Sequence, residues 1–207
     1  MPENLHKLFV ISSPSGGGKT SLINKLFEDS RSANFEKSIS DTSRQKRQGD
    51  LEGKDYYFLS EKDFKDKIKK EEYVEYATVF GNFYGTSKEE IKTKYNNSNL
   101  ILELDWQGAY AVKELFDDAK LIFLVPPSLD DLKQRLIKRN LDSSEAIENR
   151  LSEAKKEISK SEMYDYLVLN DDFDKAFEDL SQILFEGISP IDFNSRASKD
   201  LIKRLVE

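Results

Sequence analysis

The sequence predicts an α/β protein with a parallel, doubly wound sheet, because short apolar runs alternate with segments of helical periodicity. Three runs are almost continuously apolar, which is typical of strands covered on both faces of a parallel sheet. They are Lys7–Ser12, Leu100–Leu104 and Lys120–Val125, and each precedes a helical segment. A chain of 207 residues is long enough to bury a core built from such units.

The helices of this core are predicted from apolar residues that recur every three or four positions. Within Thr20–Phe27, for example, Leu22, Ile23 and Leu26 share one face. The other predicted core helices are Trp106–Phe116, Ser128–Lys138 and Asp172–Phe185, and Tyr166–Leu169 is a further strand. We therefore assign residues 1–33 and 91–187 to the core.

Residues 34–90 interrupt this alternation of strand and helix. The segment contains short strand-like pieces separated by turn glycines, and one short helix that would begin after Ser60. The strand-like pieces are Phe35–Ser40, Tyr56–Leu59 and Tyr73–Phe80, and the helix is Glu61–Lys70. We interpret the segment as a small inserted α+β subdomain.

Two further segments lie outside the regular pattern. A polar break at Asn140–Ser144 separates two helical stretches, which predicts a mobile helical lid over about residues 136–155. Residues 188–207 contain Pro190 and then a short amphipathic run, which predicts a C-terminal helical extension.

The composition excludes several classes of protein. There is no cysteine and only one histidine, so we expect any metal to be held by oxygen ligands. The net charge of −7 argues against a nucleic-acid partner, because such binding needs a surplus of Lys and Arg. Nothing after Met1 resembles a secretion signal, and the apolar runs are only strand-sized, so we expect a cytoplasmic protein with no membrane partner.

The run Ser13–Thr20 has the spacing of a phosphate-binding P-loop, with serine in place of the first glycine. Gly16–Gly18 would allow backbone N–H groups to point at a phosphate, while Lys19 reaches further phosphates and Thr20 takes one Mg²⁺ position. A flexible turn is the alternative, but the placement between a strand and a helix favours a nucleotide site. The candidate residues are Ser13, Pro14, Ser15, Gly16, Gly17, Gly18, Lys19, Thr20 and Ser21.

The P-loop alone is compatible with a GTPase, an ATPase or a small-molecule kinase. A second feature, a basic segment, is needed to distinguish among these classes. Arg44 and Arg47 are followed by turn glycines and then by tyrosines, in a chain that is acidic overall. Guanidinium groups and phenol hydroxyls suit a phosphate dianion. A solvated basic loop fits the composition equally well, so the residue types alone leave both interpretations open.

This segment resembles the signature of the guanylate kinase family. Every fixed place of the signature is filled, by Thr42, Ser43, Arg44, Arg47, Asp50, Gly53, Tyr56 and Phe58. The similarity continues from about Lys7 to Glu186. It implies a P-loop NTPase core, a GMP-binding subdomain at 34–90 and transfer of the γ-phosphoryl group of ATP to GMP with Mg²⁺.

The resemblance also implies how GMP is bound. Its phosphate would contact Arg44, Arg47, Tyr56 and Tyr84, and its base would contact the guanine set, by which we mean Ser40, Glu75 and Thr86. The chemistry agrees, because guanine presents two adjacent donors that one carboxylate can accept and an O6 that a hydroxyl can contact. Adenine presents neither pattern.

Two acids stand at the end of the predicted strand Leu100–Leu104, in the order Glu103-Leu104-Asp105, where the family usually has Asp-x-Asp. We expect Asp105 to contact Mg²⁺ through water or to contact GMP, because it lies at the carboxyl edge of the sheet. Glu103 is one methylene longer than the family residue and is a second candidate for contact with GMP.

Three arginines, Arg135, Arg139 and Arg150, flank the polar break of the predicted lid. Positioned cations supply most of the catalysis in phosphoryl transfer. An arginine on a helix is most often a surface residue that pairs with an acid. The resemblance instead implies that Arg139 and Arg150 are catalytic residues, together with Lys19 and Arg44. It also implies that Arg135 and Asn170 lie near ATP.

Two other function classes share parts of this pattern. An inactive guanylate-kinase-like module binds protein partners and usually lacks the P-loop lysine, whereas this chain has Lys19 and Thr20. A P-loop kinase of a phosphorylated sugar would lack the guanine set. The sequence therefore favours an active guanylate kinase over both.

Overall fold

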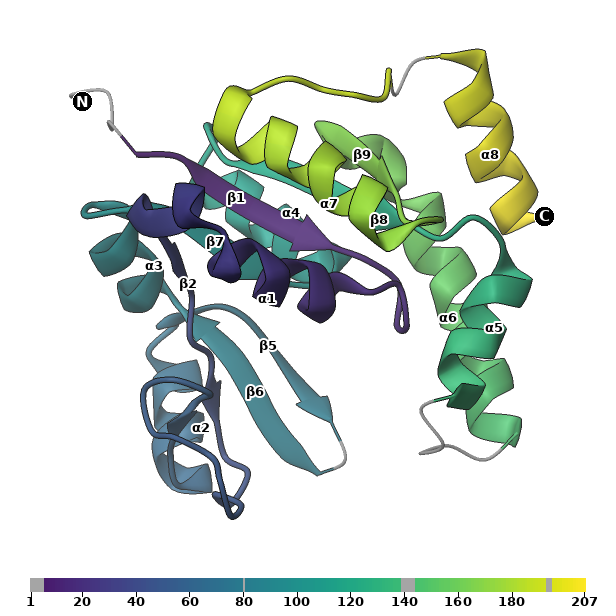
Figure 1. Ribbon diagram of the computed structural model, residues 1–207. Coiled ribbons are helices and arrows are strands. Elements are labelled where there is room, and N and C mark those ends of the chain that lie inside the picture. Colours follow the sequence, from purple (N-terminus) through teal and green to yellow (C-terminus); the bar gives the residue numbers. More distant parts are fainter. Residues whose placement is uncertain (1–5, 80, 139–143, 193–194) are drawn as a thin grey trace.

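The computed structural model describes residues 6–79, 81–138, 144–192 and 195–207. Its core is a five-stranded sheet in the order β2-β7-β1-β8-β9, in which every neighbouring pair is parallel. The strands are β1 Leu8–Ser12, β2 Phe35–Lys37, β7 Asn99–Glu103, β8 Lys120–Val125 and β9 Tyr166–Leu169. Helices cover both faces of this sheet (Figure 1), which confirms the predicted α/β class.

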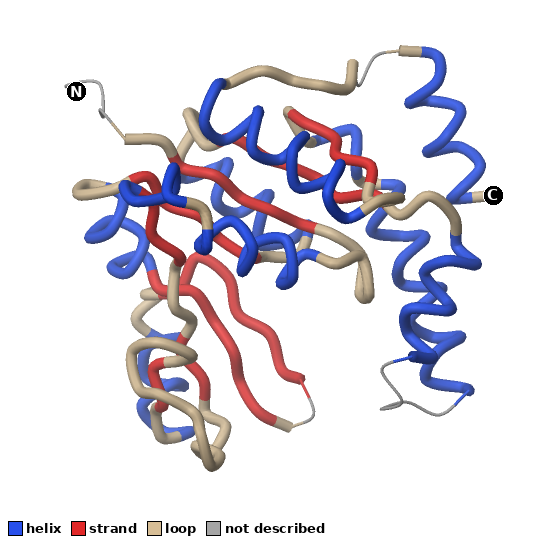
Figure 2. Tube along the Cα trace, in the orientation of Figure 1, coloured by secondary structure: helices blue, strands red, loops and turns tan. Residues whose placement is uncertain are grey.

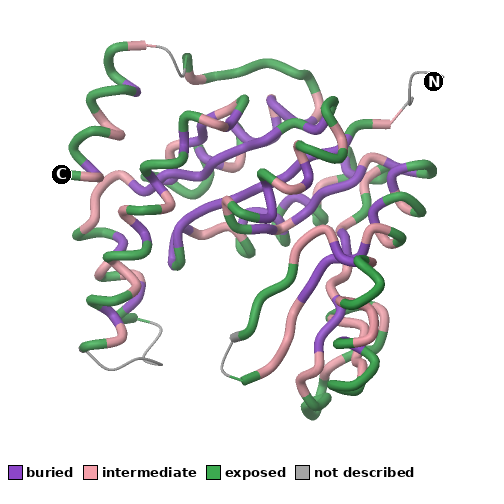
Figure 3. The backbone as a smooth tube through the Cα atoms, turned by 180° about the vertical axis from the view of Figure 1, so that it is seen from behind, coloured by how far each residue is buried: buried purple, intermediate pink, exposed green. Residues whose placement is uncertain are grey.

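Both faces of the core sheet are buried, which explains its continuous apolar strands (Figure 3). Side chains alternate along β1, so Leu8 and Val10 pack on one side and Phe9 and Ile11 on the other. The first side is covered by α3 Lys88–Tyr95, α4 Trp106–Leu115 and α6 Ser144–Ser159, and the second by α1 Lys19–Glu28 and α7 Phe173–Ser181.

A second sheet projects from the core and contains most of the predicted subdomain (Figure 2). It has four strands in the order β4-β3-β6-β5, namely β3 Asp41–Thr42, β4 Tyr57–Phe58, β5 Tyr73–Val79 and β6 Asn82–Ser87. The predicted helix is present as α2 Glu61–Lys69, capped by Ser60, and its Phe64 stacks on Tyr73 and Phe83.

One predicted strand of the insert lies elsewhere. The expected strand Phe35–Ser40 ends at Lys37 as β2, and it pairs with β7 at the edge of the core sheet. Phe35 explains this position, because its ring packs against Phe9 and Phe185 of the core. The crossing from core to second sheet therefore begins after Lys37.

The predicted lid region contains two helices, α5 Leu129–Lys138 and α6, which project beside each other at the end of the molecule away from α2 (Figure 1). The predicted C-terminal helix is present as α8 Arg196–Val206 and packs on α6. Short 3₁₀ segments occur at Ser30–Asn34 and Ser161–Met163, and a π-helical turn at Gln182–Glu186. Within the described ranges, no helix has the length and apolarity needed to cross a membrane.

Candidate active site

The P-loop follows β1 and turns back on itself before α1. Gly16 and Gly18 have φ values of 88° and 91°, a left-handed conformation that favours glycine. A Cβ atom on Gly18 would also lie 2.3 Å from Nδ2 of Asn170. The same Nδ2 donates to the carbonyl of Gly17 at 2.7 Å, so buried Asn170 braces the loop from the end of β9.

Lys19 is the first residue of α1 and links the P-loop to the carboxyl end of β7. Its Nζ donates to the carbonyl of Leu104 at 3.0 Å. Burial lowers the pKa of Lys19, and the nearby charges of Glu103, Glu157 and Asp105 oppose this shift. The lysine therefore lies where the two predicted acidic residues follow the strand.

Glu103 and Asp105 have different partners. Glu103 accepts a hydrogen bond from the Thr20 hydroxyl at 2.5 Å and pairs with Lys37 at 2.6 Å. Burial acts to raise the pKa of Glu103, but the hydrogen bonds from Lys37 and Thr20 outweigh it and hold the pKa below its usual range. Asp105 instead caps α4 by accepting from the Gly108 N–H at 2.9 Å.

The contact between Thr20 and Glu103 brings together two oxygen donors at the start of α1. Oxygen is the ligand type that Mg²⁺ prefers, so these residues fit the expected cation. Sequence reasoning missed Lys37, which ends β2. Its role depends on the pairing of β2 with β7, which no local pattern indicates.

The structure brings the guanine set together. Glu75 on β5 lies opposite Thr86 on β6, and the Thr86 hydroxyl donates to the Glu75 carboxylate at 2.7 Å. The Ser40 hydroxyl lies 3.5 Å from that of Thr86. Burial raises the pKa of Glu75, the Thr86 hydrogen bond opposes this rise, and the charge of Asp105 adds to it. The set is a half-buried acceptor beside two hydroxyls.

The predicted phosphate-binding residues also cluster, with Asp50 among them. Arg44 pairs with Asp50 at 2.9 Å and lies 5.4 Å from the ring centre of Tyr56, which in turn packs edge-on against Tyr84. Arg47 is exposed, and its backbone N–H donates to Asp50 at 2.7 Å. Asp50 therefore holds Arg44 and Arg47 in place. The fixed place of Asp50 in the sequence signature was the sign that it belongs to this cluster.

Helices α5 and α6 bring one predicted arginine to the P-loop and a second to Asn170, which braces that loop. Arg150 on α6 donates to the Ser15 hydroxyl at 3.3 Å, and Arg135 on α5 donates to the carbonyl of Asn170 at 2.7 Å. A Cβ on Gly16 would lie 3.1 Å from Leu136, so α5 itself abuts the loop. The third predicted arginine, Arg139, lies outside the described residues.

Glu157 on α6 is a further residue of this region that sequence reasoning missed. Burial raises its pKa to about 7, the charge of Lys19 acts to lower it, and the charges of Asp105 and Glu153 raise it. A signal was present, because Glu157 continues the buried stripe that contains Ala154 and Ile158. The position places a carboxyl group where the helix is otherwise apolar.

Replacing Glu157 by glutamine is expected to stabilise the protein increasingly as the pH rises. The folded-state pKa of about 7 exceeds the ordinary value of about 4.3, so wild type loses stability as the pH rises between these two values, where only the unfolded state ionises. The gain of the variant should grow between about pH 4 and pH 7 and level off above, at no more than about 4 kcal/mol. Thermal unfolding at several pH values measures this gain.

The matched control for that variant is Glu148→Gln, because Glu148 is an exposed acid on the same helix that pairs with Lys133. It should show no pH-dependent gain. A Glu157→Gln protein that is less stable than wild type at pH 8 would contradict the assignment of a buried, costly charge.

Comparisons with known proteins indicate the same family as the sequence signature. A family model described as guanylate kinase matches residues 5–187. The guanylate kinase of Hahella chejuensis is 48% identical over 178 residues, covering 86% of this chain and 85% of that protein. The guanylate kinase of Wolbachia sp. subsp. Brugia malayi is 46% identical over 184 residues, covering 88% and 93%.

A solved structure is also similar over nearly the whole chain. The crystal structure of guanylate kinase from Anaplasma phagocytophilum aligns with a TM-score of 0.67 and 32% identity, covering 99% of this chain and 98% of that one. The P-loop, the guanine set and these likenesses lead to one conclusion. The chain belongs to the guanylate kinase family and has the kinase activity for which that family is named.

Proposed function

We propose that this guanylate kinase moves the γ-phosphoryl group of ATP onto GMP by direct in-line transfer between two half-sites. The observation that carries the proposal is the presence in one chain of a P-loop with Lys19 and a guanine set whose side chains contact one another. The family implies ATP and GMP as the substrates. Positioning and charge supply the catalysis, because the attacking phosphate oxygen of GMP is already anionic.

The donor half-site is the P-loop with the start of α1. The backbone N–H groups of the Ser13–Gly18 loop, apart from Pro14, which has none, bind the phosphates of ATP together with the ammonium of Lys19. Ser21 lies in the first helical turn. Thr20 would hold Mg²⁺ directly, and Asp105 would hold it through water. Mg²⁺ bound to ATP neutralises phosphate charge and orients the phosphoryl group. Glu103, already bonded to Thr20, stays a candidate ligand at the same position.

The acceptor half-site is the second sheet. Arg44 and Arg47 bind the phosphate of GMP together with the hydroxyls of Tyr56 and Tyr84. Burial raises the pKa of Tyr56, so its hydroxyl stays protonated and able to donate. When GMP binds, Arg44 either gives up its ion pair with Asp50 for one with the phosphate or pairs with both.

The base of GMP lies against the guanine set. Glu75 accepts from N1–H and N2–H₂, while Ser40 and Thr86 contact O6. Glu103 and Asp105 remain second candidates for contact with the acceptor.

The lid closes over both half-sites. Arg150, Arg139 and Arg135 bring positive charge to the phosphoryl group, and closure excludes water that would otherwise accept it. The contacts of Arg150 with Ser15 and of Arg135 with Asn170 support this role. Asn170 also lies near the adenine of ATP in this arrangement.

We assign these roles to the predicted units. Residues 1–33 and 91–187 form the core, together with β2 and with the lid at about 136–155. The rest of residues 34–90 bind GMP, and residues 188–207 are an extension. Because ATP and GMP are intracellular metabolites, the enzyme acts in the cytoplasm. Its net charge of −7 argues against nucleic acid as a partner, and no role requires a membrane.

Assays of ADP release with different acceptors test the proposed function. We expect rapid turnover with GMP and Mg-ATP, and rates lower by about 10⁴ with AMP, because AMP leaves the half-buried acceptor of Glu75 unpaired. UMP and ribose bisphosphate should be equally poor. Turnover of ribose bisphosphate would indicate a sugar kinase, and the absence of any turnover would indicate an inactive binding module.

A further inference from the structure

The polypeptide crosses between the core and the second sheet at two places, and each crossing borders a residue of the guanine set. The first crossing, residues 38–40, leads from β2 to β3 and ends at Ser40. The second is at Ser87, which directly follows Thr86 and caps α3. Whatever holds these crossings therefore sets the relative position of the Ser40 and Thr86 hydroxyls.

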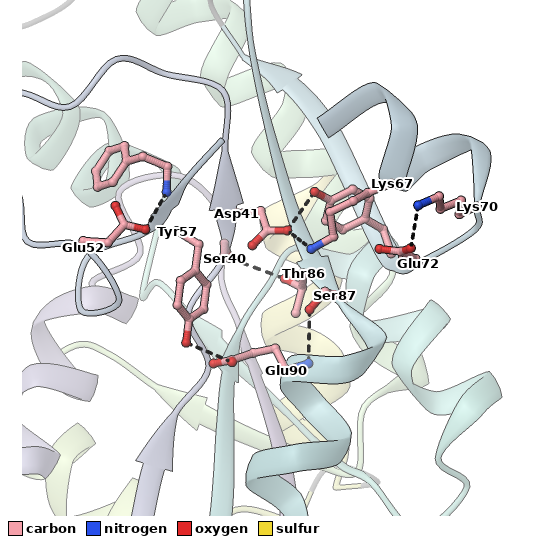
Figure 4. A network of polar contacts seen from close by, with 12 residues as sticks. Ser40, Asp41, Glu52, Tyr57, Lys67, Lys70, Glu72, Thr86, Ser87 and Glu90 are labelled. Atoms are coloured by element: carbon pink, nitrogen blue, oxygen red, sulfur yellow. Dashed lines mark hydrogen bonds and ion pairs between the residues drawn. The ribbon is translucent and has the colours of Figure 1, made fainter. Parts of the chain in front are cut away.

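Glu90, in the first turn of α3, contacts both crossings, and Figure 4 shows its contact with Ser87 at the second. Its Oε1 accepts the backbone N–H of Ile39, the residue before Ser40, at 2.9 Å. Its own backbone N–H donates to the Ser87 hydroxyl at 3.1 Å. Glu90 thus joins the two crossings, although Ile39 lies 51 positions before it in the chain.

The carboxylate of Glu90 is itself held by a nearly buried ion pair. Lys94 lies 2.8 Å from Oε1, and the side chains of Lys94 and Glu90 are only 16% and 10% exposed. Lys94 also donates to the carbonyl of Lys37, at the start of the first crossing, at 2.8 Å. Removing one member of such a pair leaves an uncompensated charge, so this contact resists rearrangement.

Tyr57 connects the same carboxylate to the backbone of Ser40. Its hydroxyl donates to Oε2 of Glu90 at 3.4 Å, and its backbone N–H donates to the carbonyl of Ser40 at 3.0 Å. Ser40 is therefore held through the residue before it and through Tyr57, and both connections lead to Glu90. Figure 4 shows the contact of Tyr57 with Glu90.

The fold of the second sheet itself depends on other contacts. Asp41, on the far side of Ser40, accepts from Lys67 at 2.5 Å and from the Tyr73 hydroxyl at 2.8 Å. These bonds, with the packing of Phe64, hold β3, β5 and α2 together without Glu90. Loss of the Glu90 carboxylate should therefore weaken the connection between the second sheet and the core, while the second sheet itself stays folded.

We propose that Glu90 is a positioning residue for guanine recognition, which fixes the two crossings so that the Ser40 and Thr86 hydroxyls are held at the spacing that O6 of the base requires. This inference rests on the proposed guanine role of Ser40 and Thr86. Glu90 touches no reacting group, so it acts on the acceptor half-site and not on ATP.

Steady-state kinetics of Glu90→Ala test the inference. The KM for GMP should rise about tenfold, which corresponds to the loss of a hydrogen bond to a charged acceptor, while kcat and the KM for ATP change less than about twofold. Glu90→Gln keeps an oxygen acceptor for the Ile39 N–H and should give a smaller rise. If Glu90→Ala does not fold, the proposal is tested by the rise in the KM for GMP of Glu90→Gln alone.

Glu89→Ala is the matched control, because Glu89 is an exposed acid in the same helical turn. Its KM for GMP should equal that of wild type. An unchanged KM for GMP in the Glu90 variants, an equal rise in the KM for ATP, or an equal effect of Glu89→Ala would overturn the proposed role.

Thr86→Ala distinguishes this failure from a failure of the guanine assignment. If Thr86→Ala raises the KM for GMP and Glu90→Ala does not, the guanine set stands and the role of Glu90 is wrong. If Thr86→Ala has no effect, the guanine assignment fails, and the positioning role that depends on it fails as well.

Discussion

Replacing Lys19 by methionine is expected to lower kcat by about 10³-fold or more and to leave the Kd for GMP within about twofold of wild type. The methionine keeps an apolar stem of similar length but removes the ammonium that contacts the transferred phosphoryl group. GMP binds to the other half-site, so its affinity should not depend on this charge. Coupled ADP release gives kcat, and isothermal titration of GMP gives the Kd.

Lys25→Met is the control for this experiment, because Lys25 is an exposed lysine of the same helix that pairs with Glu28. It should have wild-type kcat. Circular dichroism of Lys19→Met should match wild type, since burial already disfavours the charged form of this lysine and lowers its pKa. A loss of GMP affinity in Lys19→Met would contradict the division into donor and acceptor half-sites.

Replacing Glu75 by glutamine is expected to lower kcat/KM for GMP by about 10²- to 10³-fold. The amide keeps one oxygen but directs an N–H₂ group toward a guanine edge that also consists of donors. The KM for ATP should not change. Because AMP makes no use of the carboxylate, kcat/KM for AMP should hardly fall, and the preference for GMP should shrink accordingly.

The pH dependence separates recognition by Glu75 from other effects. The carboxylate must be ionised to accept two donors, and burial raises its pKa above the ordinary value of about 4.3. On acidification the KM of wild type for GMP should therefore rise at a higher pH than an ordinary carboxyl group would cause. The phosphate of GMP also titrates, and it does so equally with wild type and with Glu75→Gln. The pH dependence of the KM for GMP in Glu75→Gln therefore shows the contribution of the phosphate alone.

The stability of Glu75→Gln should move in the opposite direction to its activity. A carboxyl group with a raised folded-state pKa destabilises the fold when it is ionised, so the neutral amide should unfold at an equal or higher temperature near pH 7. Glu72→Gln, at the turn before β5, is the control and should keep wild-type kinetics. A Glu75→Gln enzyme with full activity would remove Glu75 from the guanine set.

The elements that the sequence predicted well are those fixed by local pattern. The strand, glycine loop and helix around Lys19 follow from apolar runs and from backbone conformations that favour glycine. Ser60 marked the start of α2 because a side-chain oxygen can cap a helix, and it does accept from the Asp63 N–H. The grouping of Ser40, Glu75 and Thr86 came from family resemblance and agrees with their contacts.

The features that the sequence did not predict depend on contacts distant in the chain. The strand β6 mixes polar residues with Gly85, so it has no clear alternation, and it exists because it pairs with β3 and β5. The pairing of Lys37 with Glu103 spans 66 positions, and it requires the edge position of β2. The cap that Asp105 makes on α4 likewise gives this acid a structural role besides the one expected from the resemblance.

A crystal structure of this chain with GMP bound tests the account most directly. We expect the carboxylate of Glu75 to accept from N1–H and N2–H₂ of guanine, the Ser40 and Thr86 hydroxyls to lie at O6, and the phosphate to lie between Arg44 and Arg47. A base that contacts Glu103 or Asp105 in place of Glu75, or a GMP phosphate bound in the P-loop beside Lys19, would contradict the proposed acceptor half-site.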